Sequence, residues 1–154
     1  MSASRRFSVF DDSHWPLLIN RLEGEASNEE LDDYLARSTD YMSRGRPFVL
    51  VVDLGRVANP PIEQRQRLGA WSRQNDALMR RTVLGTVYIN PSAIIRLALS
   101  VLLYARKPSH PYVIVSQEHQ ALEWAIKRLE DVGLHAPAER IRRDLGLLPE
   151  YRAG

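Results

Sequence analysis

Six polar or charged residues stand at or just beyond the carboxyl ends of three predicted strands. They are Asp53, Arg56, Asn90, Ser92, Arg96 and Ser116. In open α/β sheets, ligands and partners dock at this edge. Guanidinium groups and helix N-termini favour negative charge. We therefore expect these residues to form a rim that binds an anionic ligand or an acidic loop of a partner protein.

The same side chains also have a purely structural explanation. Asn90 and Ser116 precede predicted helices and are suitable N-cap residues. Asp53 is placed to accept hydrogen bonds from loop amides or to pair with an arginine. Arg96 either pairs with a carboxylate such as Asp53 or extends into water. Both explanations remain open at the level of the sequence.

No catalytic or metal-binding pattern accompanies this rim. The chain has no cysteine, which excludes disulfides and thiolate chemistry. Its four histidines show neither H-x-H nor H-E-x-x-H spacing. The nucleophile elbow G-x-S-x-G is absent, as are the glycine-rich phosphate loops. We predict no catalytic residues, no metal, no cofactor and no enzymatic activity.

Length and composition indicate a single soluble domain. The chain has 154 residues, of which 44% are hydrophobic and 26% charged, and its net charge is only +2. That charge is too small to predict nucleic-acid binding. The longest apolar stretch, residues 93–105, is well short of the roughly 20 residues that span a bilayer. No apolar signal-peptide core follows the N-terminus, and we expect the protein in the cytoplasm.

The segment Phe48–Val52 predicts how the sheet is built. Its apolar residues do not alternate with polar ones, which is typical of a central parallel strand with both faces covered. Ser27 and Glu30 form a capping box for the preceding helix, which Gly45 ends. The strands are expected at 7–10, 16–22, 48–53, 83–89 and 112–115, and the helices at 27–43, 62–81, 92–107, 116–132 and 138–145.

This order predicts an α/β fold with a mixed, mostly parallel five-stranded sheet covered by four to five helices. The second strand, 16–22, has a mixed pattern and is expected near an edge. We expect one domain over residues 1–154, with a core at about 7–134 and a C-terminal helical extension at 137–154 that ends in a frayed tail. The three tryptophans are expected to anchor the core.

The predicted helix 92–107 is apolar almost all round, although a helix that covers a sheet needs only one apolar stripe. Its outer side therefore needs a cover. Three covers are possible: a second copy of the chain, the C-terminal helix of the same chain, or a lipid-like ligand. Self-association is the leading hypothesis.

The sequence resembles the STAS/SEC14 family, also called SpoIIAA-like after bacterial anti-sigma factor antagonists. The motifs that carry the resemblance are Trp15-Pro16-Leu17, Leu22-Glu23-Gly24-Glu25, Phe48 to Asp53, Ala70-Trp71, Ser92 to Arg96, Glu123-Trp124, Leu129 and Gly133-Leu134. The resemblance implies a non-catalytic domain that binds a protein partner, and its SEC14-like members imply lipid binding.

The best-known members of this family carry a phosphorylated serine or threonine just past the central strand. In this chain residues 53–62 contain neither residue, so the resemblance does not carry a phosphorylation switch over.

Overall fold

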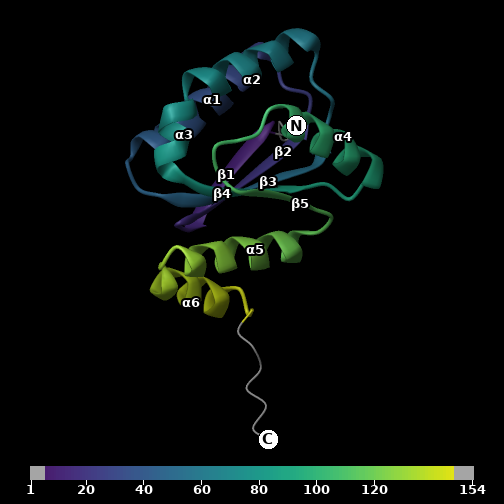
Figure 1. Ribbon diagram of the computed structural model, residues 1–154. Helices are drawn as coiled ribbons and strands as arrows, with labels where there is room; N and C mark the ends of the chain where they lie inside the picture. Colours follow the sequence, from purple (N-terminus) through teal and green to yellow (C-terminus); the bar gives the residue numbers. More distant parts are fainter. Residues whose placement is uncertain (1–5, 148–154) are drawn as a thin grey trace, which may run out of the picture.

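The chain forms one twisted sheet whose five strands follow the order of the sequence, β1-β2-β3-β4-β5 (Figure 1). The computed structural model describes residues 6–147. The strand β1 pairs antiparallel with β2, and the other three pairs are parallel. The strands are β1 (Ser8–His14), β2 (Leu17–Gly24), β3 (Phe48–Val57), β4 (Val83–Ile89) and β5 (Tyr112–Val115). The predicted α/β fold with a mostly parallel five-stranded sheet is confirmed.

The strand β3 lies at the centre of the sheet, between β2 and β4, as its apolar sequence predicts. Val49 and Val51 have no exposed surface and pack against one layer of helices. Phe48 is equally buried but packs on the opposite face. Both faces of this strand are therefore covered, which confirms the expectation drawn from its lack of alternation.

Two layers of helices cover the sheet (Figure 1). One face carries α1 (Asn28–Ser43), α2 (Ile62–Gln74) and α3 (Asp76–Thr82), and the other carries α5 (Glu118–Asp131) and α6 (His135–Asp144). Ala138 and Ile141 of α6 are buried in the same core cluster as α5. Part of the predicted C-terminal extension thus contributes to the core, and residues 148–154 of that extension, with the predicted frayed tail, lie outside the described residues.

The capping box of α1 forms as predicted. The Ser27 hydroxyl accepts a hydrogen bond from the Glu30 amide at 3.1 Å, and the Glu30 carboxylate accepts one from the Ser27 amide at 3.0 Å. After the helix, Gly45 has a φ of +72°, in the left-handed region that glycine adopts at little cost. Local sequence therefore determines both ends of α1.

The first hairpin differs from the prediction. The strand β1 runs on to His14, beyond the predicted end at residue 10, and β2 lies one strand in from the edge strand β1. The pairs Asp11–Ile19 and His14–Leu17 extend the hairpin through polar residues. Polar side chains are ordinary on an edge strand, because one side of that strand faces water. The alternation that marks a strand in sequence is therefore missing in β1.

The helix predicted over 62–81 is two helices. Asn75 lies between α2 and α3, and its side-chain amide donates to the carbonyl of Trp71 at 2.9 Å. Asparagine side chains compete in this way with backbone hydrogen bonds and interrupt helices. The last helix, α6, also begins three residues earlier than expected.

The predicted core role of the tryptophans holds in part. Trp124 packs against the core cluster on the α5 side, while Trp15 and Trp71 pack against the cluster on the other face. All three are partly rather than fully buried.

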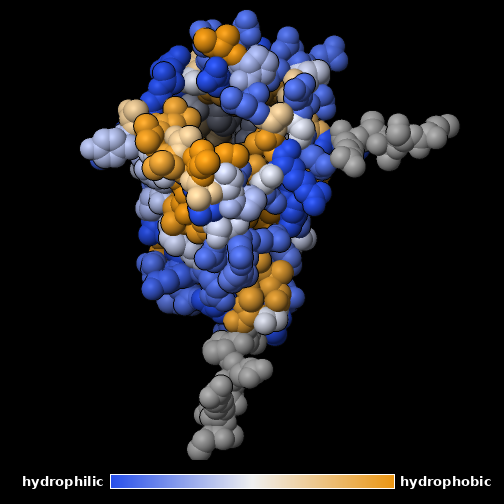
Figure 2. Space-filling model, turned by 90° about the vertical axis from the view of Figure 1, so that its right-hand side faces the viewer, coloured by the Kyte–Doolittle hydropathy of each residue, from blue (hydrophilic) through white to orange (hydrophobic). Residues whose placement is uncertain are grey.

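The helix α4 (Ala93–Ala105) has no buried residue, although it is almost entirely apolar. It lies beside β5, on the side of the molecule that faces the viewer in Figure 2, where apolar side chains gather around a hollow. The hypothesis that the C-terminal helix covers α4 is wrong. That helix, α6, packs on α5, on the face of the sheet opposite α1, α2 and α3. None of the helices in residues 6–147 is both long and apolar enough to cross a bilayer.

Candidate functional site

A basin of about 380 Å³ lies at the carboxyl ends of β2 and β3. Its lining combines three arginines, two carboxylates and two aliphatic side chains: Arg6, Val9, Arg21, Leu22, Glu23, Asp53 and Arg56. We call it the strand-end basin. It lies at the edge of the sheet where open α/β folds bind ligands.

Arg21 is held in place beside the basin by carboxylates from two other elements. Its Nη2 donates to Glu118 Oε1 at 2.7 Å, at the start of α5, and its Nη1 lies 3.9 Å from Asp11 Oδ2. Hydrogen bonds from Ser13 hold the pKa of Asp11 below its usual value, so this carboxylate stays charged opposite the guanidinium. Arg21 therefore connects β1, β2 and α5.

Asp53 and Arg56 are the two predicted rim residues that line the basin. Asp53 Oδ1 accepts a hydrogen bond from the Gly55 amide at 2.9 Å, but this amide belongs to β3, which runs four residues beyond the predicted strand end, and not to a loop as expected. Arg56 is exposed, and it has no hydrogen bond or ion pair among the described residues. The basin thus offers a fixed carboxylate and a guanidinium group that is free to bind.

Asn90 forms a junction between strands instead of the predicted helix cap. It is 4% exposed, and its side-chain amide donates to the Leu54 carbonyl at 3.0 Å. Its Oδ1 accepts from the Ser92 amide at 2.9 Å, and its own amide donates to the Val115 carbonyl at 3.0 Å. These contacts join the ends of β3, β4 and β5 to the start of α4.

Ser92, not Asn90, caps α4. Its hydroxyl accepts from the Ile95 amide at 3.3 Å, and the helix begins at Ala93, after the predicted first-turn Pro91. Arg96 does not pair with Asp53. Its Nη1 donates instead to the carbonyls of Asn90 and Pro91, both at 3.0 Å. Asn90, Ser92 and Arg96 therefore act together, in fixing the start of α4.

Ser116 stands apart from the other predicted residues. The N-cap of α5 is Gln117, and the Ser116 hydroxyl donates to Gln120 Oε1 at 3.0 Å. Sequence reasoning also missed the contribution of β1 and β2 to the basin. Arg21 is paired in register with Asp53, so its place at the rim depends on the pairing of β2 with β3.

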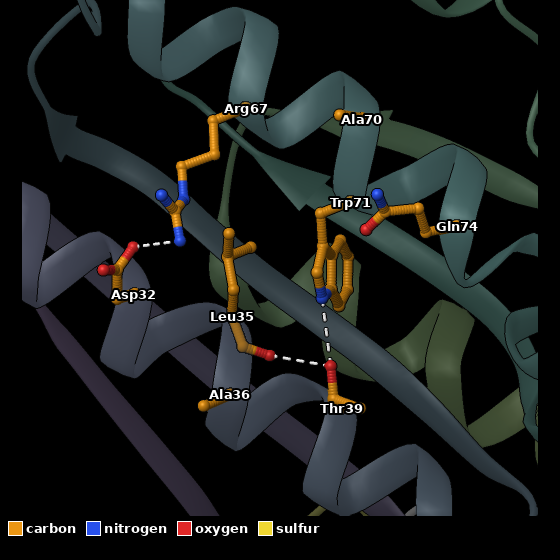
Figure 3. Close-up of a pocket in the computed structure, with 8 residues that line it drawn as sticks. All are labelled: Asp32, Leu35, Ala36, Thr39, Arg67, Ala70, Trp71 and Gln74. Carbon is orange, nitrogen blue, oxygen red and sulfur yellow. Dashed lines mark hydrogen bonds and ion pairs between the residues drawn. The ribbon is translucent and has the colours of Figure 1, made fainter.

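A second concave surface lies between α1 and α2 (Figure 3). This groove of about 390 Å³ is lined by Asp32, Leu35, Ala36, Thr39, Arg67, Ala70, Trp71 and Gln74. Its polar groups bind one another: Arg67 forms an ion pair with Asp32, and Trp71 Nε1 donates to Thr39 Oγ1 at 3.0 Å. Because these contacts join the two helices, the groove is explained by their packing.

The histidines of the described chain lie away from the basin. His110 Nε2 lies 2.7 Å from Thr86 Oγ1, and burial lowers the pKa of His110. Within residues 6–147, no group of three or more histidine and acidic side chains is arranged to hold a metal ion. The basin itself is lined by arginines, carboxylates and aliphatic side chains, which are groups that bind other charged and apolar surfaces.

Comparison with solved structures places this geometry in a known fold. An uncharacterized protein of the DUF3478 family with a SpoIIAA-like fold, from Shewanella loihica PV-4, matches 81% of this chain and 98% of its own with 12% identity and a TM-score of 0.63. An anti-sigma factor antagonist from Mycobacterium paratuberculosis matches the same shares with 19% identity and a TM-score of 0.51.

A chain from the complex of the diguanylate cyclase SiaD with its activator SiaC, from Pseudomonas aeruginosa, matches 76% of this chain and 98% of its own. Its identity is 13% and its TM-score 0.50. No protein-family model and no curated protein sequence matches the chain. The resemblance seen in the sequence is therefore confirmed at the level of the fold: the chain is an α/β domain with the SpoIIAA-like fold.

Proposed function

We propose that the protein is a non-enzymatic recognition domain of the cytoplasm that binds a partner protein at the strand-end basin. The observation that carries this proposal is the exposed Arg56 beside the tethered carboxylate of Asp53, at the edge of the sheet where partners dock. Opposite charges fixed side by side give specificity and orientation to a protein contact. Within residues 6–147, the side chains that line the basin include no hydroxyl, thiol or imidazole group.

The comparisons support a role in protein recognition. One structural neighbour is an anti-sigma factor antagonist, and another comes from a complex between an enzyme and its activator. Those names describe the neighbours' own partners. For this chain they favour a protein as the bound molecule, without identifying it.

The partner is tested by affinity capture from the native organism, with the wild-type protein and Arg56→Glu as baits. Arg56 is exposed, so its replacement is expected to leave the fold intact. Lys127→Glu, an exposed charge reversal on α5, is the matched control. We expect one or more proteins to be captured by the wild type and the control but depleted at least about tenfold with Arg56→Glu. Equal capture by all three baits would contradict binding at the basin.

An anionic small molecule is the second candidate for the same site. The basin volume of about 380 Å³ lies within the range of ligand pockets, and three of its lining residues are arginines. The sequence also predicted that Asn90, Ser92, Arg96 and Ser116 belong to the binding rim. Their contact with a ligand stays a prediction. Native mass spectrometry of the purified protein distinguishes this case, because a retained ligand adds mass that Arg56→Glu removes.

Self-association through helix 92–107 also stays a prediction, as does a lipid-like ligand on that helix. The structure offers such partners an exposed apolar surface on α4. Size-exclusion chromatography with light scattering gives the mass in solution. A monomer at all concentrations would contradict self-association.

A further inference from the structure

The helix α4 presents an apolar surface to solvent. We define the α4 ridge by its exposed large side chains: Ile94, Ile95, Leu97, Val101, Leu102 and Tyr104. Ile94 is 82% exposed and Tyr104 is 73% exposed. Helical spacing places these side chains over about half of the circumference, and only Arg96, Leu99 and Leu103 lie on the less exposed inner side. Figure 2 shows the apolar side chains together on this face.

This surface is unusual because the fold does not require it. Single exposed apolar residues are normal, but a contiguous group of six marks a site of interaction. An exposed helix fits a partner that can close around it. A lipid bilayer does so without a preformed groove, since a helix of this length can lie in the interface with its apolar side among the acyl chains.

The segment of the chain that contains the ridge carries only positive charge. Residues 77–117 contain no aspartate or glutamate, but they contain five basic residues: Arg80, Arg81, Arg96, Arg106 and Lys107. Two of these, Arg106 and Lys107, directly follow the last turn of α4. The Lys107 ammonium lies 5.1 Å from the centre of the Tyr104 ring, which joins the charge to the apolar surface.

Arg73 of α2 extends this basic end of the ridge. The Nη1 atoms of Arg106 and Arg73 both lie close to Gly69, at 3.0 and 3.4 Å from the position that a Cβ would occupy there. Neither guanidinium has a carboxylate partner among the described residues. Two guanidinium groups near one point, without a compensating anion, form a site for phosphate. We call Arg73, Arg106 and Lys107 the basic end.

Pairing of two α4 helices does not supply that anion. If two α4 helices pair in parallel, the two basic ends meet. If they pair antiparallel, each basic end meets the N-terminus of the other helix, which is also positive. An anionic phospholipid offers both missing components, acyl chains for the ridge and phosphates for the basic end. Tyrosine and lysine are also the residues that sit at the boundary between headgroups and acyl chains.

We propose that the α4 ridge docks the protein on the surface of an anionic phospholipid bilayer. The helix lies in the plane of the interface with its apolar side chains inserted, and Arg73, Arg106 and Lys107 contact lipid phosphates. No residue of α4 lines the strand-end basin, so docking leaves the proposed partner site open. The inference is independent of that proposal, and either can fail alone.

Vesicle sedimentation tests the docking with the full-length protein. One set of vesicles consists of phosphatidylcholine, and the other is an equal mixture of phosphatidylcholine and phosphatidylglycerol. We expect the wild type to bind the mixed vesicles at least about tenfold more tightly, with binding that weakens as salt is added. Equal binding to both kinds of vesicle, or no binding to either, overturns the proposal.

Two double variants separate the two components. Leu97→Gln/Val101→Gln removes apolar surface, and Arg106→Glu/Lys107→Glu reverses the basic end. Each is expected to weaken binding to the mixed vesicles by about tenfold or more. The matched controls are Ile62→Gln, which changes an exposed apolar residue on α2, and Arg46→Glu/Lys127→Glu, which reverses two exposed charges elsewhere. If the control variants bind the mixed vesicles as weakly as the α4 variants do, the lipid contact lies elsewhere and the proposal is overturned.

Hydrogen exchange on the wild type needs no variant. Addition of mixed vesicles is expected to slow exchange in residues 93–107 and to leave α5 unchanged. Slowed exchange elsewhere but not in α4 overturns the proposal. Light scattering provides the final outcome: a stable dimer that becomes monomeric in Leu97→Gln/Val101→Gln shows that a second copy covers α4, which also overturns it.

Discussion

The helices α4 and α5 have similar lengths and lie against the same sheet. However, α5 buries apolar side chains in the core, whereas α4 exposes its apolar side chains to solvent. In α5 four residues, Ala121, Ala125, Ile126 and Leu129, are completely buried, Leu122 and Trp124 pack partly against them, and the rest of the helix is polar. In α4 almost every residue is apolar and none is buried. The number of apolar residues in a helix therefore does not show how many of them are buried in the core. In this molecule α5 maintains the fold, and α4 is available for recognition.

The largest effect is expected in α5. Leu129→Ala removes a fully buried side chain that contacts both the sheet and α6. Such truncations cost about 2–5 kcal/mol of the free energy of unfolding. Chemical denaturation measures this change, with the exposed Lys127→Ala of the same helix as the control. A loss below about 1 kcal/mol would mean that α5 contributes less to the core than its burial indicates.

The junction at the start of α4 gives the next effect. Asn90→Ala leaves the Leu54 carbonyl and the Ser92 amide without their side-chain partners in a buried setting. We expect the free energy of unfolding to fall by about 1–3 kcal/mol. Asn90→Asp keeps the acceptor for Ser92 but places a buried carboxylate oxygen against the Leu54 carbonyl, so a loss at least as large as that of Asn90→Ala is expected. If both variants are as stable as the wild type, the junction does not hold the strand ends together.

Helix caps sharpen the comparison between core and exposed helices. Ser27→Ala removes the cap of α1, whose Leu31 and Leu35 are buried, and it should cost about 1 kcal/mol of global stability. Ser92→Ala removes the cap of α4, which can open locally without exposing the core. We expect this second variant to speed amide exchange at the start of α4 and to leave global unfolding nearly unchanged. Equal global losses would show that α4 is coupled to the core.

The smallest effect concerns pH. Burial lowers the pKa of His110 in the folded protein, although the charge of Asp76 opposes the shift. The folded state therefore binds this proton less readily than the unfolded chain, so His110 makes stability fall as pH drops below about 6.5. Denaturation at pH 7 and pH 5 measures the fall, and His110→Gln is expected to reduce it. An identical pH dependence in the variant would contradict this assignment.

The parts of the fold that the sequence predicted depend on local patterns. Unbroken apolarity identified β3 as a central strand, and the Ser27–Glu30 pair identified the start of α1. Both signals act within a few residues, so no knowledge of the sheet is needed. The break at Asn75 was missed because helical spacing continues across it, and only the side-chain contact with Trp71 reveals it.

The candidate site was harder to predict because it depends on register. Asp53 and Arg56 lie in the second half of β3, which the sequence identifies, but Arg21 joins them only through the pairing of β2 with β3. Asn90 lies at the end of β4 and Arg96 in the first turn of α4, and both donate hydrogen bonds to backbone carbonyls. The sequence also identified the excess apolarity of helix 92–107, but burial is not determined by apolarity, since apolar residues are common on protein surfaces.

The central claim is that α5 belongs to the core and α4 does not. The stability of one variant, Ile94→Gln/Leu97→Gln/Val101→Gln, tests this claim most directly. Glutamine maintains helix propensity, so the substitution removes apolar surface from α4 with little other change. We predict a free energy of unfolding within about 1 kcal/mol of the wild-type value, because these three side chains are already exposed. A loss of several kcal/mol, comparable to that of Leu129→Ala, would show that α4 belongs to the core and would contradict the account.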